Sequence, residues 1–199
     1  MVLKIAPDLD VPQLIEMAEV IRDSKIDGVI ISNTTIQRPK ELINGEHYSF
    51  CRYQKANLKN LANKFEQGGL SGPPIKHFSL KALQTLRSHL PASIPLIGCG
   101  GINTGQDALD YAKAGASVVQ VYTGFAYDGP GACRRIKDQL AELLVKEGKT
   151  WEGVVRDAVD RLSWKGDCGK KEDSEITVSK LIEEAKELNV VLDKLAQCL

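Results

Sequence analysis

The sequence has few of the features that mark membrane-spanning, nucleic-acid-binding or metal-binding chains. No uninterrupted apolar stretch approaches the roughly 20 residues that a membrane-spanning helix needs. The 26 basic residues balance the 26 acidic ones, so no net charge attracts nucleic acid, and we expect no nucleic-acid partner. The five cysteines form neither a CxxC pair nor a zinc-ligand spacing, which indicates reduced thiols of an intracellular protein and no metal site.

The 199 residues, of which 43% are hydrophobic, suffice for one domain with an appendage. The most informative stretch is 95–123, where apolar runs at 95–97 and 118–121 flank a helical segment at 106–113. Two short apolar runs joined by one helical period form a βαβ unit, and their lengths are typical of strands buried on both faces. The sequence therefore predicts a parallel sheet with a right-handed crossover.

A cluster of glycines at 98–101 lies where the first of these strands is expected to end, and the second strand runs into Tyr122, Thr123 and Gly124. Parallel α/β folds place their ligand sites at such strand ends. Without Cβ atoms, backbone N–H groups can approach an anion closely. The cluster is therefore typical of a phosphate site, although tight turns and close helix packing alone would also require glycine.

A strand is also expected at 3–6, followed by a helix at 11–24. Lys4 lies inside this strand, and its side chain allows two interpretations. An edge-strand lysine would lie in solvent, whereas an inward-facing one would need an anion or an electron-rich ring beside it. The residues alone favour the solvent position.

A further buried strand is expected at 28–32, and it runs into Asn33, Thr34 and Thr35. Small side chains that both donate and accept hydrogen bonds suit the edges of a planar, carbonyl-rich ligand. They suit an ordinary polar turn equally well, so both interpretations stay open at this point.

The segment 40–67 is much longer than the usual βα loop. We expect a solvated lid or an excursion peculiar to this chain, with a helix in its second half; a surface for RNA or an acidic partner is the alternative. A second glycine-rich loop follows at 68–72. Ser79 is expected to cap a helix that reaches Leu90.

The predicted order of elements amounts to four βα units, which is half of an eightfold α/β barrel. This half barrel spans 1–148, with 40–67 as an insertion and a last helix from Pro130 to about 146. The helical tail, 149–199, contains a helix at 151–162, a charged linker and an amphipathic helix at 178–199. That last helix is expected to dock on the outside of the barrel, with coiled-coil pairing as the alternative.

Five motifs occur together in the order found in the dihydroorotate dehydrogenase family. They are KIAPDL at 4–9, SNTT at 32–35, GGLSG at 68–72, GCGGI at 98–102 and QVYTG at 120–124. The pair Arg38-Pro39 and the phrase GFAYDGP at 124–130 resemble class 2, the quinone-linked, membrane-associated form. The resemblance covers 1–148 apart from the long loop.

The resemblance implies an α/β (β/α)8 TIM-type barrel that binds FMN and oxidises dihydroorotate to orotate, with quinone as acceptor, in de novo pyrimidine (UMP) biosynthesis. It moves Lys4 from solvent to a position beside the flavin. Matched position by position, it assigns cofactor contacts to Lys4, Ser32, Gly72, Gly101, Tyr122 and Thr123. It assigns contacts with the orotate ring to Asn33 and Thr34.

The chain also departs from the family. The family's barrel has eight strands, and its catalytic base, a serine in class 2, belongs to the half that is not in this sequence, so the catalytic residue is unknown here. An amino-terminal helical pair that leads quinone to the flavin, and the targeting segment of eukaryotic members, are not present either, so we expect Met1 to be an artefact of truncation or of gene prediction. Through that amino-terminal region the family associates with a membrane, which implies the mitochondrial inner membrane in a eukaryote or the cytoplasmic membrane in a bacterium.

Two other interpretations remain. One is another FMN barrel, such as a dihydropyrimidine or dihydrouridine reductase, which would have the same phosphate-binding glycines. The other is a non-catalytic half barrel or assembly fragment.

Overall fold

The computed structural model describes residues 1–38 and 68–166. The chain forms two compact units, Met1–Trp164 and Lys165–Leu199, and the elements below all belong to the first. The long loop expected at 40–67 and the helix expected at 178–199 lie outside the described residues.

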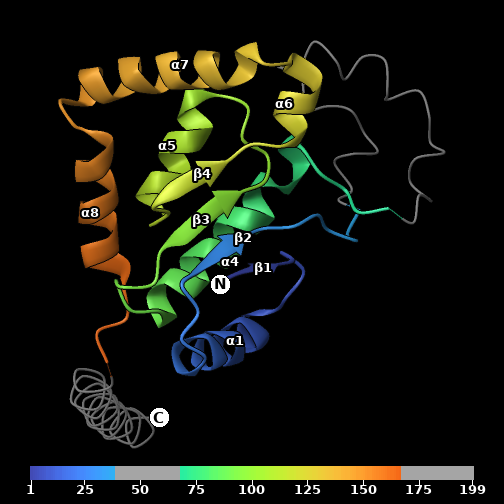
Figure 1. Cartoon of the computed structure of the whole chain (residues 1–199), viewed down its shortest axis with the longest axis vertical. Coiled ribbons are helices and arrows are strands. Elements are labelled where there is room, and N and C mark those ends of the chain that lie inside the picture. Colours follow the sequence, from blue (N-terminus) through green and yellow to red (C-terminus); the bar gives the residue numbers. More distant parts are fainter. Residues whose placement is uncertain (39–67, 167–199) are drawn as a thin grey trace, which may run out of the picture. The chain divides into compact units, whose positions relative to one another are not determined.

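A four-stranded sheet forms the centre of the first unit (Figure 1). Its strands are β1 (Val2–Ile5), β2 (Gly28–Ile31), β3 (Leu96–Cys99) and β4 (Val118–Gln120). They pair in chain order, and every pair is parallel. This topology confirms the predicted parallel sheet and is that of a partial (β/α) barrel.

Helices follow the strands as a barrel requires. They are α1 (Val11–Asp23), the 3-10 helix η2 (Pro73–Ile75), α4 (Lys76–His89), α5 (Gly105–Lys113), α6 (Thr123–Asp128), α7 (Gly131–Glu147) and α8 (Trp151–Leu162). The sequence predicts all the longer ones to within a few residues at each end but misses η2 and α6. Within the two described ranges, no helix is both long and apolar enough to cross a membrane.

Local sequence explains where two helices begin. Asp10 accepts a hydrogen bond from the Gln13 amide at 2.9 Å, and the Gln13 side chain accepts one from the Asp10 amide at 3.0 Å. Thr104 and Asp107 form the same reciprocal pair at the start of α5. Each pair satisfies amides that have no acceptor inside the helix.

The prediction that Ser79 caps α4 is wrong. Pro73 and Pro74 have the fixed φ that suits a first helical turn, and with Ile75 they form η2, so α4 begins already at Lys76. Ser79 is therefore buried inside the helix, and its Oγ lies 2.6 Å from Oγ of Ser32 at the end of β2.

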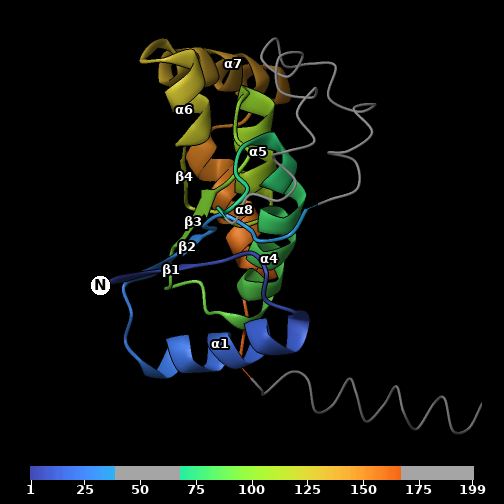
Figure 2. The same cartoon turned by 90° about the vertical axis from the view of Figure 1, so that its right-hand side faces the viewer.

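The core lies between one face of the sheet and the helices on that side; Figure 2 shows α4 and α5 together on one side of the strands. Alternate residues of the two central strands, Val29, Ile31 and Leu96, are completely buried. The helices contribute Leu14, Ala18 and Ile21 from α1, Leu83 and Leu86 from α4, and Ala108 and Tyr111 from α5.

The opposite face of the sheet remains in contact with solvent. Val2 is 47% exposed and Val118 is 51% exposed, while Ile30 and Ile97 between them are only partly buried. The expectation that the strand at 118–121 is buried on both faces is therefore wrong for the described residues. In a closed barrel this face lines the interior and is covered by the other strands.

The predicted helix at 151–162 forms with those bounds as α8 and belongs to the first compact unit. It packs on α5, where Val154 meets Leu109 and Ala112. The indole N–H of Trp151 donates to the Ser117 carbonyl at 3.2 Å. Both contacts attach α8 to α5 and to the loop that follows α5.

Arg87, at the end of α4, is completely buried. Its guanidinium donates to the carbonyls of Ile94 at 3.0 Å and Leu90 at 2.9 Å, and also to that of Pro91. Burial lowers the pKa of Arg87 to about 10, so the group stays charged near neutral pH. The side chain thereby fixes the turn that leads from α4 into β3.

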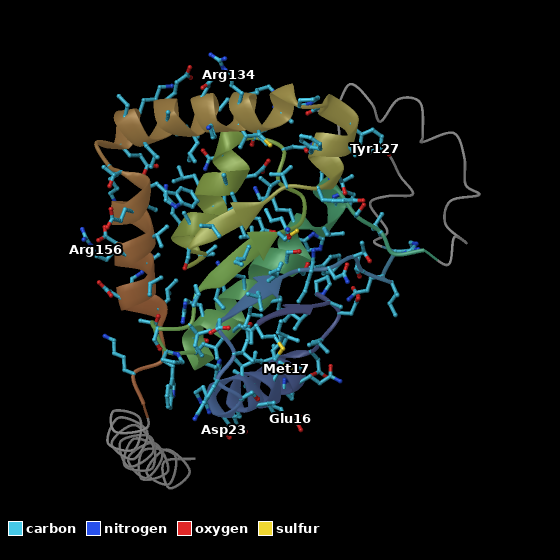
Figure 3. The ribbon with its side chains drawn as sticks, in the orientation of Figure 1. Glu16, Met17, Asp23, Tyr127, Arg134 and Arg156 are labelled. Atoms are coloured by element: carbon cyan, nitrogen blue, oxygen red, sulfur yellow. The ribbon has the colours of Figure 1, made fainter. Side chains whose placement is uncertain are left out.

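We expect Arg87→Leu to lower the free energy of unfolding by about 2 to 4 kcal/mol, because buried carbonyls lose a charged donor. Urea denaturation followed by circular dichroism measures this. Arg134→Leu is the control, since Arg134 lies on the outer side of α7 and points away from the ribbon (Figure 3); it should change stability by less than about 0.5 kcal/mol. Equal losses in the two variants would contradict a structural role for Arg87.

Candidate functional site

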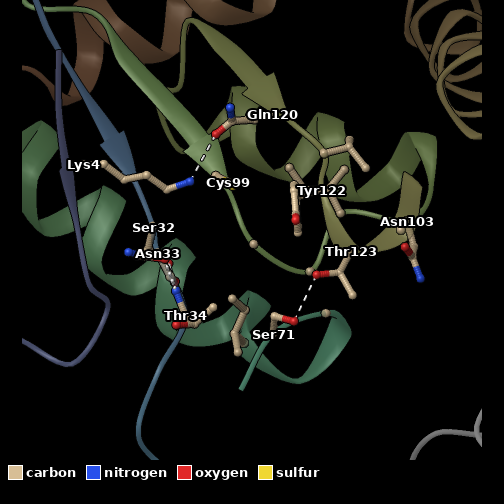
Figure 4. A pocket seen from close by; sticks show the side chains of 17 residues that line it. Lys4, Ser32, Asn33, Thr34, Ser71, Cys99, Asn103, Gln120, Tyr122 and Thr123 are labelled. Carbon is tan, nitrogen blue, oxygen red and sulfur yellow. Dashed lines mark hydrogen bonds between the residues drawn. The ribbon is translucent and has the colours of Figure 1, made fainter. Parts of the chain in front are cut away.

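A cavity of about 220 Å³ opens at the carboxyl ends of the four strands (Figure 4). All eight residues that the family resemblance selects line it: Lys4, Ser32, Asn33, Thr34, Gly72, Gly101, Tyr122 and Thr123. They come from segments up to about 120 positions apart in the chain, and the parallel sheet brings them together because its strand ends meet at one edge.

Lys4 enters the cavity from β1, an edge strand of the described sheet. Its Nζ lies 3.4 Å from Oε1 of Gln120, which follows Val118 and Val119 on β4. The side chain is exposed, as the residues alone suggest, and it also lines the cavity, as the resemblance implies. The two interpretations are therefore compatible, because the cavity is open to solvent on this side.

The end of β2 supplies Ser32, Asn33 and Thr34. Ser32 is buried. Its hydroxyl donates to the Asn33 carbonyl at 2.9 Å, and its backbone amide donates to the Cys99 carbonyl at 2.6 Å. Asn33 and Thr34 are exposed in the cavity, with the Thr34 amide donating to Oδ1 of Asn33 at 2.9 Å. The side chains of Asn33 and Thr34 are thus available to a polar ligand.

Thr35 has a different role from its two neighbours. It is completely buried, its hydroxyl donates to Asp8, and its backbone exchanges two hydrogen bonds with Leu70. Thr35 therefore belongs to the polar turn and attaches the loop after β2 to the glycine-rich loop at 68–72.

The glycines after β3 allow the backbone to come very close to α4. Gly100 and Gly101 have φ angles of +120° and +70°, which side-chain-bearing residues rarely adopt. A Cβ on Gly101 would lie 2.7 Å from Cβ of Lys76 and 2.9 Å from its amide nitrogen. Gly72, with φ of +81°, lines the cavity from the other glycine-rich loop. Both loops thus present bare backbone to the cavity.

The chain after β4 turns directly into α6. The strand ends at Gln120, and Thr123 is the first residue of the helix. The Thr123 hydroxyl donates to Oγ of Ser71 at 3.0 Å (Figure 4). The first amides of a helix have no acceptor within it, and Thr123 and Gly124, which both line the cavity, carry two of them.

Among the lining residues that were not selected from the sequence, four have a heteroatom in the side chain: Ser71, Cys99, Asn103 and Gln120. The sequence could have indicated Gln120, because it is a polar residue inside the apolar run 118–121. It lies on the same face of the sheet as Lys4. Cys99 is buried at the end of β3, where burial raises the pKa of its thiol and the nearby Lys4 ammonium opposes this. Its burial depends on the packing of other elements, which the local sequence does not reveal.

Chemically, the cavity suits a ligand with an anionic group. Among the described residues that line it, Lys4 is the one charged side chain, and none is a carboxylate. Glycine backbone and hydroxyl groups gather at one end, near Gly72, Gly101 and Thr123. A cation at one end and amide donors at the other fit an elongated molecule with a phosphate.

The family model described as dihydroorotate dehydrogenase matches residues 1–144 of the chain. Among curated proteins, the chain is 48% identical over 154 residues to the mitochondrial dihydroorotate dehydrogenase (quinone) of Lachancea kluyveri, covering 77% of this chain and 31% of that protein. The rice protein of the same name is 42% identical over 148 residues, covering 74% of this chain and 28% of the relative. A bacterial dihydroorotate dehydrogenase (quinone), from Christiangramia forsetii, is 41% identical over 140 residues, which are 70% and 36% of the two chains.

A solved structure of the enzyme from Eimeria tenella, in complex with ferulenol, is similar with a TM-score of 0.64 and 37% identity. The match covers 79% of this chain and 37% of that one. The chain thus spans about a third of the length of the curated relatives it matches.

Proposed function

Because the chain belongs to the dihydroorotate dehydrogenase family, we propose that it forms part of a quinone-linked enzyme that oxidises dihydroorotate to orotate in de novo pyrimidine biosynthesis. The observation that carries this proposal is the convergence of eight residues, selected by resemblance from five separate motifs, on one cavity. The names of the relatives support quinone as the electron acceptor. The activity belongs to the whole enzyme, of which this chain represents about a third in the relatives.

A flavin is the cofactor that the family implies, and we propose FMN. The residues present fit its phosphate end, because Gly72 and Gly101, both with positive φ, line the same cavity as Tyr122 and Thr123 at the start of α6. Gly72, Gly101, Tyr122 and Thr123 would hold the phosphate. The cavity of about 220 Å³ is smaller than the roughly 300 to 1,000 Å³ typical of sites that enclose a whole ligand, which supports a site completed by further strands.

When bound, FMN supplies the two-electron redox chemistry that couples dihydroorotate oxidation to quinone reduction. In this chain, Lys4 provides a positive charge that favours negative charge developing beside it. Gln120 accepts a hydrogen bond from Lys4 and so limits the directions in which the ammonium points. Asn33 and Thr34 offer amide and hydroxyl groups that can both donate to and accept from a carbonyl-rich ring. Ser32 contributes a buried hydroxyl next to them.

The fungal and plant relatives are named as mitochondrial proteins, which supports a mitochondrial location in a eukaryotic host. We propose association with the inner membrane there, and with the cytoplasmic membrane if the host is bacterial.

The enzyme purified from its natural source tests the proposed activity. We expect it to form orotate from dihydroorotate, measured by ultraviolet absorbance, with matching reduction of a short-chain quinone. Dihydrouracil and dihydrouridine are assayed in parallel. Turnover of either of these without turnover of dihydroorotate would assign the protein to another FMN barrel, and no turnover with any of the three would favour a non-catalytic protein.

Lys4→Ala tests the position of the cation beside the flavin ring. In the same enzyme with bound FMN, we expect the midpoint potential of the flavin to fall by about 30 mV or more, since for two electrons this corresponds to about 1.4 kcal/mol. Spectroelectrochemical titration measures the potential. Lys137→Ala, on the exposed surface of α7, is the control and should leave the potential unchanged. An unchanged midpoint potential in Lys4→Ala would show that Lys4 does not lie beside the flavin ring.

A further inference from the structure

The three loops that surround the proposed phosphate site, 68–72, 100–104 and 122–124, are connected to one another. The Thr123 hydroxyl donates to Ser71, which joins the first loop to the third. Gly124 lies so close to Asn103 that a Cβ on it would be 2.3 Å from Oδ1 of that residue, which brings the third loop against the second. The first and second loops are connected in another way, through the start of α4.

Lys76, the first residue of α4, makes this connection with two carboxylates of α5. Its Nζ donates to Asp107 at 2.6 Å and to Asp110 at 2.7 Å. We call these three residues the Lys76 cluster. Burial lowers the pKa of the Lys76 ammonium, but the hydrogen bonds and charges of the two carboxylates outweigh it, and the pKa lies above its ordinary value. Lys76 is therefore positively charged at neutral pH and lies between two carboxylates.

Asp107 connects the cluster to the backbone of the second loop. Its Oδ2 accepts hydrogen bonds from the amides of Asn103 at 3.0 Å and Thr104 at 2.8 Å, and from the Thr104 hydroxyl at 2.8 Å. Its other oxygen binds Lys76. Although burial raises the pKa of Asp107, the bonds from Lys76, Asn103 and Thr104 bring it below the ordinary value. One carboxylate thus joins the end of the glycine turn to the first residue of α4.

The backbone of Gly101 lies directly against the same residue. A Cβ at Gly101 would be within 3.0 Å of Cβ, the amide nitrogen and Cα of Lys76. Lys76 itself is not among the residues that line the cavity, and its side chain is only 26% exposed. Its charge is thus used within the protein and is not directed into the site.

We propose that the Lys76 cluster fixes the Gly101 turn in the position from which its backbone binds the flavin phosphate. Lys76 is then a positioning residue and not a ligand of the anion. This inference rests on the proposed function, because it assumes that the phosphate of FMN lies at Gly101. It predicts that damage to the cluster weakens the binding of FMN but spares that of riboflavin, which has the same ring and no phosphate.

The experiment measures the dissociation constants of FMN and riboflavin with the 199-residue chain, by flavin fluorescence. We expect Lys76→Met to weaken FMN binding by about tenfold, the equivalent of one charge-assisted interaction, and to change riboflavin binding by less than about twofold. Lys76→Arg keeps the charge and should restore most of the FMN affinity. Lys113→Met is the matched control, since it removes an α5 lysine whose 2.7 Å ion pair is with Glu147 of α7 and not with the Lys76 cluster, and it should change neither constant.

Asp110→Asn separates positioning from direct binding and leaves the helix cap at Asp107 intact. If Lys76 positions the turn, this variant should lose about threefold in FMN affinity, because one of two partners is weakened. If Lys76 were an anion ligand, freeing it from a carboxylate would raise FMN affinity, and that result would overturn the proposal. Equal losses of FMN and riboflavin in Lys76→Met, or an unchanged FMN affinity in both variants, would overturn it too. Equal binding of the two flavins by the unaltered chain would instead refute the phosphate site itself.

Discussion

Gly101→Val is expected to abolish detectable FMN binding by this chain. The residue has a φ of +70°, where a β-branched side chain costs on the order of 1–2 kcal/mol in the backbone alone. Its Cβ would also lie 2.7 Å from Cβ of Lys76, and the valine methyl groups would extend further into α4. The turn must therefore move, and the amides proposed to bind the phosphate move with it.

Two other variants separate this effect from its alternatives. Gly129→Val has the same φ of +70° but no atom within 4 Å of the added Cβ, so it places a valine at positive φ without the collision. Asn33→Ala removes a side chain proposed to contact the substrate ring. Both should retain FMN binding to within about twofold. The measurement is bound flavin per protein, determined by absorbance. Equal flavin loss in Gly101→Val and Asn33→Ala would contradict the proposed division between phosphate and substrate contacts.

The second large effect concerns the chain assayed alone, which should not oxidise dihydroorotate. None of the eight selected residues is assigned the role of catalytic base, and the loss of a general base typically lowers the rate by about two to four orders of magnitude. The cavity also lacks the enclosure that excludes water from a reacting ring. A dye-reduction assay with added FMN and dihydroorotate measures this, and turnover by the chain alone would contradict it.

The same chain should associate with itself. Among the described strands, β1 and β4 lie at the edges of the sheet, and the apolar side chains of Val2, Ile30, Ile97 and Val118 lie on its uncovered face. Such edges and faces favour pairing with another chain. We expect dimers or larger species in size-exclusion chromatography with light scattering. Val118→Lys should reduce the association, whereas Val145→Lys, on exposed α7, should not; a monomeric unaltered chain would contradict the expectation.

The sequence predicts the strands and long helices well because their apolar periodicity is strong and local. The position of Asn33 at the carboxyl edge of the sheet also follows from local information, since it comes directly after a predicted parallel strand. The sequence does not predict that Val118 is exposed, because exposure depends on which elements cover the sheet. The resemblance to a family supplied the assignments that the residues alone left open, such as that of Lys4.

Other features that the sequence does not predict correctly have specific physical causes. Ser79 has the chemistry of a helix cap, but the two prolines before it begin the helix earlier, so the serine bonds Ser32 inside the core. The contact between Ser71 and Thr123 joins residues 52 positions apart, and no local pattern reveals such a contact. The Lys76 cluster joins residues 31 and 34 positions apart, and in the sequence these look like ordinary surface charges of two helices.

The proposed function depends most directly on a phosphate site at the carboxyl ends of these four strands. The decisive measurement is the ratio of the dissociation constants of riboflavin and FMN for the unaltered 199-residue chain in solution. A phosphate held by glycine amides and the start of α6 predicts that FMN binds at least about tenfold more tightly than riboflavin, even if both bind weakly. Equal affinities, or no binding of FMN at millimolar concentration, would contradict a phosphate site in this chain.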